Sequence, residues 1–297
     1  MLNGGPVLIP GEISVICREY DEAGLVSKEW YLGTENEPVV HAKNKYAKVE
    51  KTYLDKDHVI SEAWFDTEGK PMTTGDTYVR IEREFDEKKN TIRERTFDTD
   101  GNQIDRKDGY DEIRREFNEK NQAKRSEYYL GGEPVALKGG YSALEREYDN
   151  AGNVSYEKYF DTAFQPVLCK NGYGAVRKEY KTKNQVIHEQ WYDTEGKPMP
   201  CPGDVYCGIR REFDENGLAN VLKFFDGNDQ PTKCAAGYEM VWRRFNDKKQ
   251  VNYETYMDHD GQLTPNAKGV YQTAYDYDEN GKAIREVYFD ADGQSMA

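Results

Sequence analysis

Aromatic residues recur along the chain at a fixed interval, each inside a short run in which apolar and charged residues alternate. Aligned on these "REYD"-like runs, the chain shows nine anchors separated by 31 to 33 residues: Tyr20, Tyr53, Phe85, Phe117, Tyr148, Tyr180, Phe213, Phe245 and Tyr277. Alternation with a period of two predicts β-strands, and self-similarity at a fixed period of this length is typical of repeat proteins. We therefore interpret residues 1–297 as a single tandem array of nine units of about 32 residues.

Further aromatic columns follow the same period. Twelve residues after the anchor of the last eight units stand Phe65, Phe97, Tyr129, Phe160, Tyr192, Phe225, Met257 and Phe289, and the shorter first unit supplies Tyr31. The positions directly before this column hold Trp30, Trp64, Tyr128, Tyr159, Trp191, Phe224, Tyr256 and Tyr288. Neighbouring residues of a strand point to opposite faces, so one column can fill a core while the other is exposed or packs on a neighbouring unit.

The turn chemistry joins the two strands of each unit into a hairpin. "DENG" occurs in the seventh and ninth units, and an Asn-Gly pair between aromatic-rich runs predicts a two-residue type I′ turn, because both positions need positive φ. The units with "KKN" and "DKK" lack this pair, and we expect longer loops there. A turn at Asn216 and Gly217 sets Phe213 opposite Asn220, Arg211 opposite Leu222 and Ile209 opposite Phe224.

The same register predicts a recurring cross-strand ion pair. It places Lys51 opposite Glu62 and Lys178 opposite Glu189, and the basic position is Arg or Lys in eight of the nine units. An exposed pair of this kind stabilises a sheet by only ~0.2–1 kcal/mol. We interpret this part of the charge as structural.

Gly-containing turns such as "DTEG" and "DADG" follow the second strand, and a short returning segment leads to the next unit. Because such a unit cannot bury its own aromatic face, the predicted fold is all-β, an elongated solenoid of nine stacked β-hairpin repeats that grows by roughly 10 Å per unit. A closed nine-bladed propeller is less favoured, since its blades usually need four strands. The sequence begins and ends in mid-repeat, which predicts a fragment of a longer polypeptide.

Composition narrows the set of partners. The formal net charge of −14 disfavours nucleic acid, whose phosphates bind Lys and Arg, and also an anionic membrane surface. We expect no direct membrane insertion, because no run approaches the ~20 apolar residues that cross a bilayer. The N-terminus has no signal-peptide pattern, so the compartment depends on what lies outside this sequence: the cell surface if a signal or membrane segment stands there, otherwise the cytoplasm.

Catalytic and metal-binding motifs give little support for an enzyme. The four His, at positions 41, 58, 188 and 259, share no register, and we expect neither catalysis nor a cofactor in this fragment. "DTDGN", "DHDGQ" and "DADGQ" are similar to the opening of an EF-hand loop but lack its closing carboxylate, so turn chemistry is favoured over a weak structural calcium ion. Cys169, Cys201 and Cys234 form one column about 10 Å apart, beyond disulfide reach, and are expected to be small buried side chains.

The aromatic column that begins with Trp30 is the candidate binding site. Exposed rows of rings stack on sugars or surround quaternary ammonium groups by cation–π contact. Asp66 and Asp193 follow two of these rings closely and would favour a cationic decoration such as choline or a D-alanyl ester. The alternative is that both faces are covered and every ring belongs to the core. The candidate ligand-binding rings are Trp30, Trp64, Tyr128, Tyr159, Trp191, Phe224, Tyr256 and Tyr288.

Two nearly identical stretches carry a resemblance to known repeats. "WFDTEGKPM" (64–72) and "WYDTEGKPM" (191–199) resemble the core of the choline-binding and glucan-binding repeats of Gram-positive surface proteins. The present unit is longer than those repeats, and Pro71 and Pro198 stand before the Met. The whole unit is similar to the longer repeats of bacterial wall-polymer proteins, including teichoic-acid-type transferases, and also resembles the YD-type repeats of bacterial toxins. The resemblance implies stacked hairpins that bind a choline-bearing or glucan-like polymer.

We therefore expect a non-catalytic binding or spacer module whose partner is a cell-wall polymer or surface saccharide of the choline, teichoic-acid or glucan type. The alternative is a protein–protein interaction or self-association scaffold appended to an enzyme of surface-polymer metabolism. The open ends of a solenoid expose unpaired strand edges, so either hypothesis predicts a homodimer through those ends.

Overall fold

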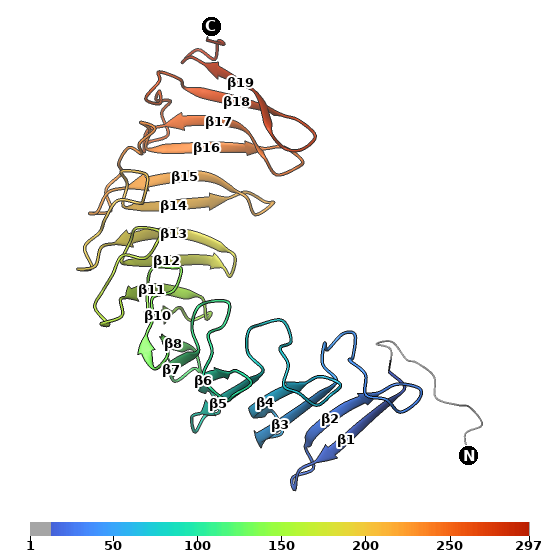
Figure 1. The fold of residues 1–297 in the computed structure, drawn as a ribbon. Coiled ribbons are helices and arrows are strands. Elements are labelled where there is room, and N and C mark those ends of the chain that lie inside the picture. The colour runs from blue at the N-terminus through green and yellow to red at the C-terminus, as the bar shows by residue number, and fades with distance from the viewer. Residues whose placement is uncertain (1–12, 297) are drawn as a thin grey trace. The chain divides into compact units, whose positions relative to one another are not determined.

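The computed structural model describes residues 13–296, which are all-β and contain no helix (Figure 1). The predicted class, an all-β array of stacked hairpin repeats, is confirmed. The strands are β1 (Val15–Tyr20), β2 (Val26–Leu32), β3 (Lys48–Asp55), β4 (His58–Phe65), β5 (Arg80–Phe85), β6 (Thr91–Phe97), β7 (Glu112–Phe117), β8 (Ala123–Leu130), β9 (Glu133–Pro134), β10 (Ala143–Tyr148), β11 (Val154–Phe160), β12 (Ala175–Thr182), β13 (Gln185–Tyr192), β14 (Gly208–Phe213), β15 (Ala219–Phe225), β16 (Met240–Phe245), β17 (Val251–Met257), β18 (Gln272–Tyr277) and β19 (Ala283–Phe289).

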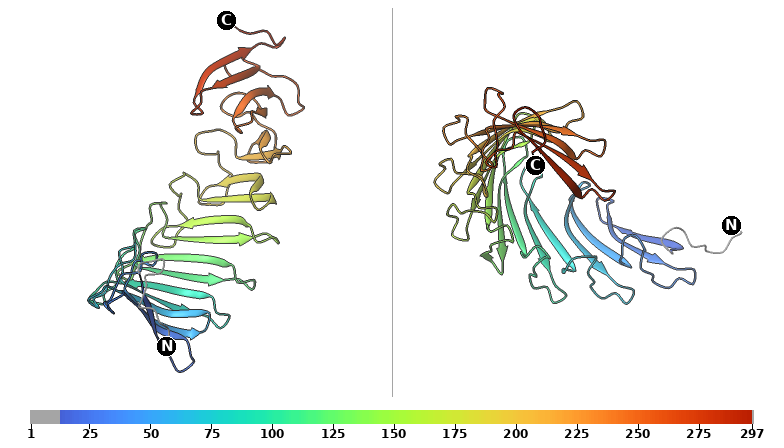
Figure 2. Two further views of the ribbon diagram at one scale, coloured as in Figure 1. Left: turned by 90° about the vertical axis from the view of Figure 1, so that its right-hand side faces the viewer. Right: turned by 90° about the horizontal axis from the view of Figure 1, so that it is seen from above.

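The chain divides into two compact units. The first comprises the described residues up to Leu144 together with Asp161–Phe164, and the second comprises Glu145–Phe160 and the described residues from Gln165 onward. Within each unit, consecutive strands pair antiparallel, both inside a hairpin, as β3 with β4, and between hairpins, as β4 with β5. The tight hairpin turns lie at one end of the strands and the longer connecting segments at the other (Figure 2).

The register inside the hairpins agrees with the predicted one except beside the turn. Arg211 stands opposite Leu222 and Ile209 opposite Phe224, as expected. Phe213, however, stands opposite Ala219 and not Asn220, because a bulge follows Glu212. The ion-pair register is also confirmed, with Lys51 opposite Glu62 and Lys178 opposite Glu189.

The bulge arises from a turn that differs from the predicted one. The amide of Gly217 donates to the carbonyl of Asp214, and the amide of Asp214 donates to the carbonyl of Leu218, which closes a three-residue loop. Asp214 Oδ1 also accepts from the amides of Asn216 and Leu218. Gly217 has a positive φ of 76°, whereas Asn216 does not, so this is not a two-residue type I′ turn. The carboxylate that anchors the turn explains why Asp begins it.

The expectation of longer loops at "KKN" and "DKK" is wrong for the same reason. Lys89 and Lys249 take the left-handed position, with φ of 68° and 62°. Their amides donate to the carbonyls of Asp86 and Asn246, so both loops have the length of the Asn-Gly turn. The anchoring side chain therefore fixes the loop, and Gly is not required at its third position.

The hairpins have two different faces, which we name from β3 and β4. The covered face carries Val49 opposite Trp64, and the groove face carries Lys48 opposite Phe65. On the covered face, Val49, Trp64 and Ile81 are buried, and the partly buried Tyr46, Met72 and Tyr78 pack on them. The returning segments before β3 and after β4 supply these three side chains, so the segments close a core that neighbouring hairpins share.

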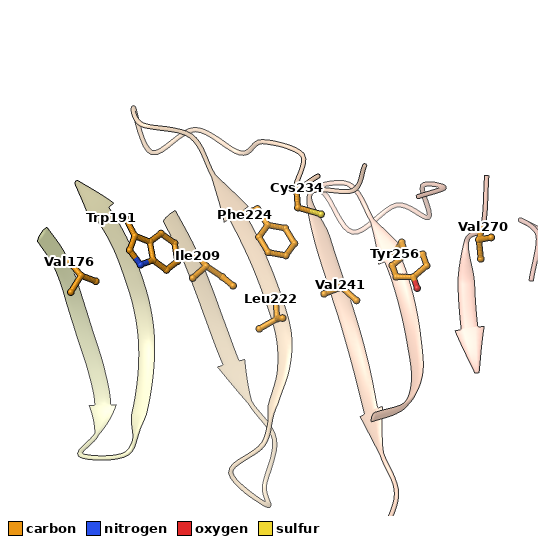
Figure 3. Packing of buried hydrophobic residues seen from close by; sticks show 9 residues of the cluster. All are labelled: Val176, Trp191, Ile209, Leu222, Phe224, Cys234, Val241, Tyr256 and Val270. Carbon is orange, nitrogen blue, oxygen red and sulfur yellow. The ribbon is translucent and has the colours of Figure 1, made fainter. Parts of the chain in front are cut away.

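The second unit builds the same core at greater length. Its buried cluster runs across consecutive strands, as Figure 3 shows for Val176, Trp191, Ile209, Leu222, Phe224, Cys234, Val241, Tyr256 and Val270. Tyr173, Met199, Cys201, Tyr206 and Tyr238 pack against it from the returning segments. This explains the repeated nonapeptide: its Trp fills the covered face, its Asp anchors the turn, and its Met returns to the core.

The first hairpin has the same register as the second, with the bulge at the same place. Tyr31 stands opposite Ile16, as Trp64 stands opposite Val49, and Tyr31 is only 2% exposed. Trp30 stands opposite Cys17 and is half-buried on the groove face. The sequence alignment placed Trp30 in the column of Trp64, which is wrong. Tyr31 occupies the place of Trp64 and Leu32 that of Phe65, so Trp30 stands at the place of Ala63, on the opposite face.

Candidate binding surface

Most rings of the predicted binding column lie in the core. Trp64, Tyr159, Trp191, Phe224 and Tyr256 are 4–9% exposed, so little of their ring surface can meet a ligand. Tyr128 and Trp30 are half-buried, and Tyr288, on β19, is exposed.

The covered-face rings continue into a ladder with Tyr residues of the returning segments. The ring centroids of Trp191 and Tyr206 lie 5.9 Å apart, those of Tyr206 and Phe224 4.7 Å, and those of Tyr238 and Tyr256 4.6 Å. These are the distances of favourable aromatic pairs. Burial raises the pKa of Tyr206 and of Tyr238 far above the usual value for a phenol, so both remain neutral. The arrangement stabilises the stacking of one hairpin on the next.

The predicted acidic site residues begin the second turns. Asp66 Oδ1 accepts from the amides of Glu68 and Lys70, and Asp193 Oδ1 accepts from those of Glu195 and Lys197. Asp98, Asp258 and Asp290, which suggested an EF-hand, make the same two bonds in their own turns. Between residues 13 and 296, no three His, Cys, Asp or Glu side chains converge as a metal site would require.

The cysteines are free thiols. Cys169 and Cys234 are buried, as expected, whereas Cys201 is half-buried and packs at the edge of the second unit's core. Burial raises the pKa of the Cys201 thiol, which disfavours the reactive thiolate form. No helix that could span a membrane occurs between residues 13 and 296.

The groove face carries rings of the other aromatic column beneath basic side chains. Lys48 Nζ lies 3.9 Å from the ring centroid of Phe65, and the Arg80 guanidinium lies 4.0 Å from that of Phe97. Arg114 over Tyr129 and Arg210 over Phe225 repeat the contact at 4.0 and 4.3 Å. Sequence analysis missed this feature, although the register that pairs Lys51 with Glu62 also puts Lys48 opposite Phe65.

A chain of ion pairs crosses this face in the first unit. Arg95 contacts Glu82 and Glu84, and Glu84 also contacts Arg93. Glu112, whose side chain is 2% exposed, binds two cations: its Oε2 lies 2.8 Å from Arg93 and its Oε1 2.5 Å from Arg114. Burial alone would raise the pKa of Glu112, but its hydrogen bonds to Arg93 and Arg114 lower it. The chain of pairs orients guanidinium groups toward solvent across strands β5 to β7.

Surface grooves recur on the groove face between the second strand of one hairpin and the first strand of the next, and three of them lie at the β6/β7, β13/β14 and β2/β3 junctions. The β6/β7 groove has a volume of about 740 Å³, the β13/β14 groove about 520 Å³ and the β2/β3 groove about 470 Å³. The first two are of the size that holds small ligands or a few sugar residues. They give the chain repeated concave sites on the face opposite to the aromatic ladder.

Comparisons with known proteins identify no family. No family model and no curated protein matches the chain. Among solved structures, a chain of the Photorhabdus luminescens Tc holotoxin pore with mutated TccC3 shares 11% identity at a TM-score of 0.27 and covers 92% of this chain and 15% of that one. A chain in the crystal structure of TcdB2-TccC3-TEV shares 12% identity at a TM-score of 0.27 and covers 95% and 17%. The chain thus spans less than a fifth of either match, and at these TM-scores the likeness carries no argument about family or function.

Proposed function

We propose that this chain is a non-catalytic binding and spacer module of β-hairpin repeats, and that it binds a linear cell-wall polymer or surface saccharide along its groove face. The observation that carries the proposal is the recurrence of one groove at equivalent hairpin junctions. A polymer repeats its own chemical unit, and a repeat protein that repeats one groove can contact several such units at once.

In this proposal the covered face stabilises the module and does not contact the polymer. Its rings are enclosed by the returning segments. The groove face presents charged side chains over rings of which Trp30 and Phe65 are half-buried, whereas Phe97, Tyr129 and Phe225 are 6–8% exposed. Such a mixture suits a ligand with both sugar or polyol surface and charged groups.

Co-sedimentation with purified Gram-positive cell wall, before and after chemical removal of teichoic acids, tests the proposal. We expect the protein to pellet with intact wall, and to lose that association if teichoic acid is the polymer. Pelleting that persists after removal would assign the site to another wall saccharide. If the protein stays in the supernatant with every wall preparation, the proposal is wrong.

A second function, self-association, is favoured by the last hairpin. Ile284 is 65% exposed and Tyr288 41% exposed, and both lie on β19, which pairs only with β18 among the described residues. Large apolar side chains beside an unpaired strand edge promote pairing with a second chain. Sedimentation equilibrium of the protein and of the variant Ile284→Lys tests this: a dimer that dissociates in the variant supports it, and a monomeric wild-type protein excludes it.

A further inference from the structure

The three grooves occupy the same place in the repeat. Glu84 lines the β6/β7 groove and Glu179 the β13/β14 groove, 95 residues later. Arg114 and Arg210 line the same two grooves and are 96 residues apart, which equals three repeats. In the β2/β3 groove, Glu50 stands at the position that Arg114 and Arg210 occupy in the other two grooves. The grooves are therefore one repeated site with substitutions, and not three unrelated hollows.

Each groove contains a basic side chain and a carboxylate that face each other at the same place. Lys28 lies 3.3 Å from Glu19, Arg93 lies 3.3 Å from Glu84, and His188 lies 3.4 Å from Glu179. The two side chains of each pair come from the two strands of one hairpin and border the groove. The carboxylates are 47–63% exposed, so solvent or a ligand can reach each pair.

The grooves are neutral or basic although the whole chain carries a net charge of −14. The lining of the β2/β3 groove has three basic and two acidic side chains, and that of the β13/β14 groove has three of each together with His188 and His259. The β6/β7 groove is the most basic, with five basic side chains against three acidic ones: Arg93, Arg114, Arg115, Lys124 and Arg125 against Glu84, Glu116 and Glu127. A concave site lined in this way attracts anions, even on an acidic protein.

We infer that these grooves are subsites for the negatively charged groups, phosphate or carboxylate, of a linear glycan or polyol polymer. The inference rests on the proposed function, because it takes for granted that a linear polymer is bound. Guanidinium groups supply paired N–H donors that fit a phosphate or a carboxylate. The ligand is thus anionic, in contrast to the cationic decorations that the sequence suggested.

The spacing of the grooves fits an extended chain. The β2/β3 and β6/β7 grooves belong to the same unit and are four strands apart, which corresponds to roughly 20 Å at the usual distance between strands. A polymer that spans both grooves gains affinity from the second contact without any new type of interaction. Short oligomers that reach only one groove are expected to bind far more weakly.

Titration calorimetry with defined polymers tests the inference. The probes are a poly(glycerol phosphate), a polygalacturonate, a neutral dextran and single-stranded DNA. We expect binding of the phosphate polymer, the carboxylate polymer or both, with affinity that falls as salt rises, and at least tenfold weaker binding of dextran and DNA. The first two probes separate phosphate from carboxylate as the recognised group.

The variant for this test is Lys124→Glu with Lys223→Glu. Lys124 lines the β6/β7 groove and Lys223 the β13/β14 groove, and their side chains are 50% and 37% exposed, so the fold should tolerate both changes. The matched control is Lys70→Glu with Lys197→Glu, which makes the same charge change at side chains that are 71% and 72% exposed and line none of the grooves. We expect about tenfold weaker binding in the groove variant and less than twofold in the control.

The outcomes separate the inference from the function on which it rests. Equal loss in both variants would show attraction by overall charge and overturn the groove sites. Binding of dextran as tight as that of the anionic polymers would leave the proposed function standing and overturn the anionic subsites. Binding of DNA as tight as that of the glycan polymers would reject the glycan as ligand. No binding of any polymer, including wall preparations, would overturn both proposals.

Discussion

The covered face and the groove face of the hairpins are made by the same strands but stabilised by different chemistry. On the covered face, Trp64 and its equivalents are enclosed by returning segments and removed from water. On the groove face, Phe65 and its equivalents are covered by single basic side chains, which leave charged groups at the surface. Burial of rings stabilises far more than exposed charge pairs do. Rings such as Phe97 and Tyr129 are buried on the groove face too, so the two faces differ in what covers the rings: backbone segments on one and charged side chains, which a ligand can reach, on the other.

The largest expected effect is the removal of a covered-face ring. Trp64→Ala should lower the free energy of unfolding by about 3–5 kcal/mol, because it leaves a cavity beside Val49, Ile81 and Tyr78. Trp30→Ala removes the same residue type from the groove face, where the ring is half-buried, and should cost roughly 1–2 kcal/mol. Hydrogen exchange of β1 to β5, combined with urea unfolding followed by circular dichroism, measures both. Equal losses of unfolding free energy in the two variants would show that a ring on the groove face stabilises the fold as much as one on the covered face.

A smaller effect is expected at Glu112, the buried carboxylate of the groove face. Glu112→Gln leaves Arg93 and Arg114 without their shared partner, and should cost about 1–3 kcal/mol at pH 7, since both cations are partly exposed and screened. Glu116→Gln, which alters a 61% exposed carboxylate paired with Lys124, is the control and should cost under about 0.5 kcal/mol.

The stability difference between wild type and Glu112→Gln should depend on pH, because the pKa of Glu112 is lowered in the folded chain. A carboxyl whose pKa is lower in the folded than in the unfolded chain stabilises the fold above the unfolded value, near ~4.3. The stability is lost as pH falls through the folded pKa. Wild type and Glu112→Gln should therefore differ fully at pH 7, and the difference in unfolding free energy should shrink in urea titrations as pH falls below the unfolded value. A difference that stays constant from pH 7 to pH 2.5 would mean that the charge of Glu112 is not its cause.

Contacts at the strand ends should contribute less than either face. The hydroxyl of Tyr180 donates to the carbonyl of Val154 in the preceding hairpin at 2.9 Å, and the hydroxyls of Tyr53 and Tyr277 make the equivalent bond to the hairpins that precede them. Tyr180→Phe should cost about 0.5–1.5 kcal/mol in urea unfolding. Tyr20→Phe, at an anchor that is 60% exposed, should be neutral. Equal effects would show that the hydroxyl bond does not join the hairpins.

The sequence predicted the stacked hairpins because turn residues and aromatic columns recur with one period, and each unit repeats the same physical constraint. It also predicted the ion-pair register, since Lys51 and Glu62 lie far enough from the turn to be unaffected by its bulge. The turn type was wrong because the carboxylate of Asp214 accepts two backbone amides, a bond that the Asn-Gly pair does not reveal. Trp30 was misplaced because the first hairpin has Leu32 at the place of Phe65, where the alignment expected a ring and put Tyr31.

The candidate site was harder to predict than the fold. Period alone cannot say which of two adjacent rings, such as Trp64 or Phe65, is enclosed, because that depends on where the returning segment packs. The grooves depend on side chains from two hairpins that are distant in sequence, such as Glu84 and Arg114, and on how far they project. The signal that could have found them is the run of Arg and Lys on the face opposite to the Trp column.

The smallest expected effect concerns pH and the β13/β14 groove, which holds His188 where the β6/β7 groove holds Arg93. His259 also lines it: its Nδ1 lies 2.9 Å from Glu239, and its ring lies near Asp258 and Asp260. The hydrogen bond to Glu239 raises the pKa of His259, so its positive charge is present below that folded value and is lost as pH rises through it. Anionic polymer should therefore bind more tightly at pH 6 than at pH 8.5, by about two- to threefold, in line with one exposed charge.

His259→Gln should reduce this pH dependence, and His41→Gln, outside the groove linings, should leave it unchanged. If both variants keep the full pH dependence, His259 does not contribute to binding and the charge that attracts the polymer comes from other side chains of the groove, such as Arg210 and Lys223.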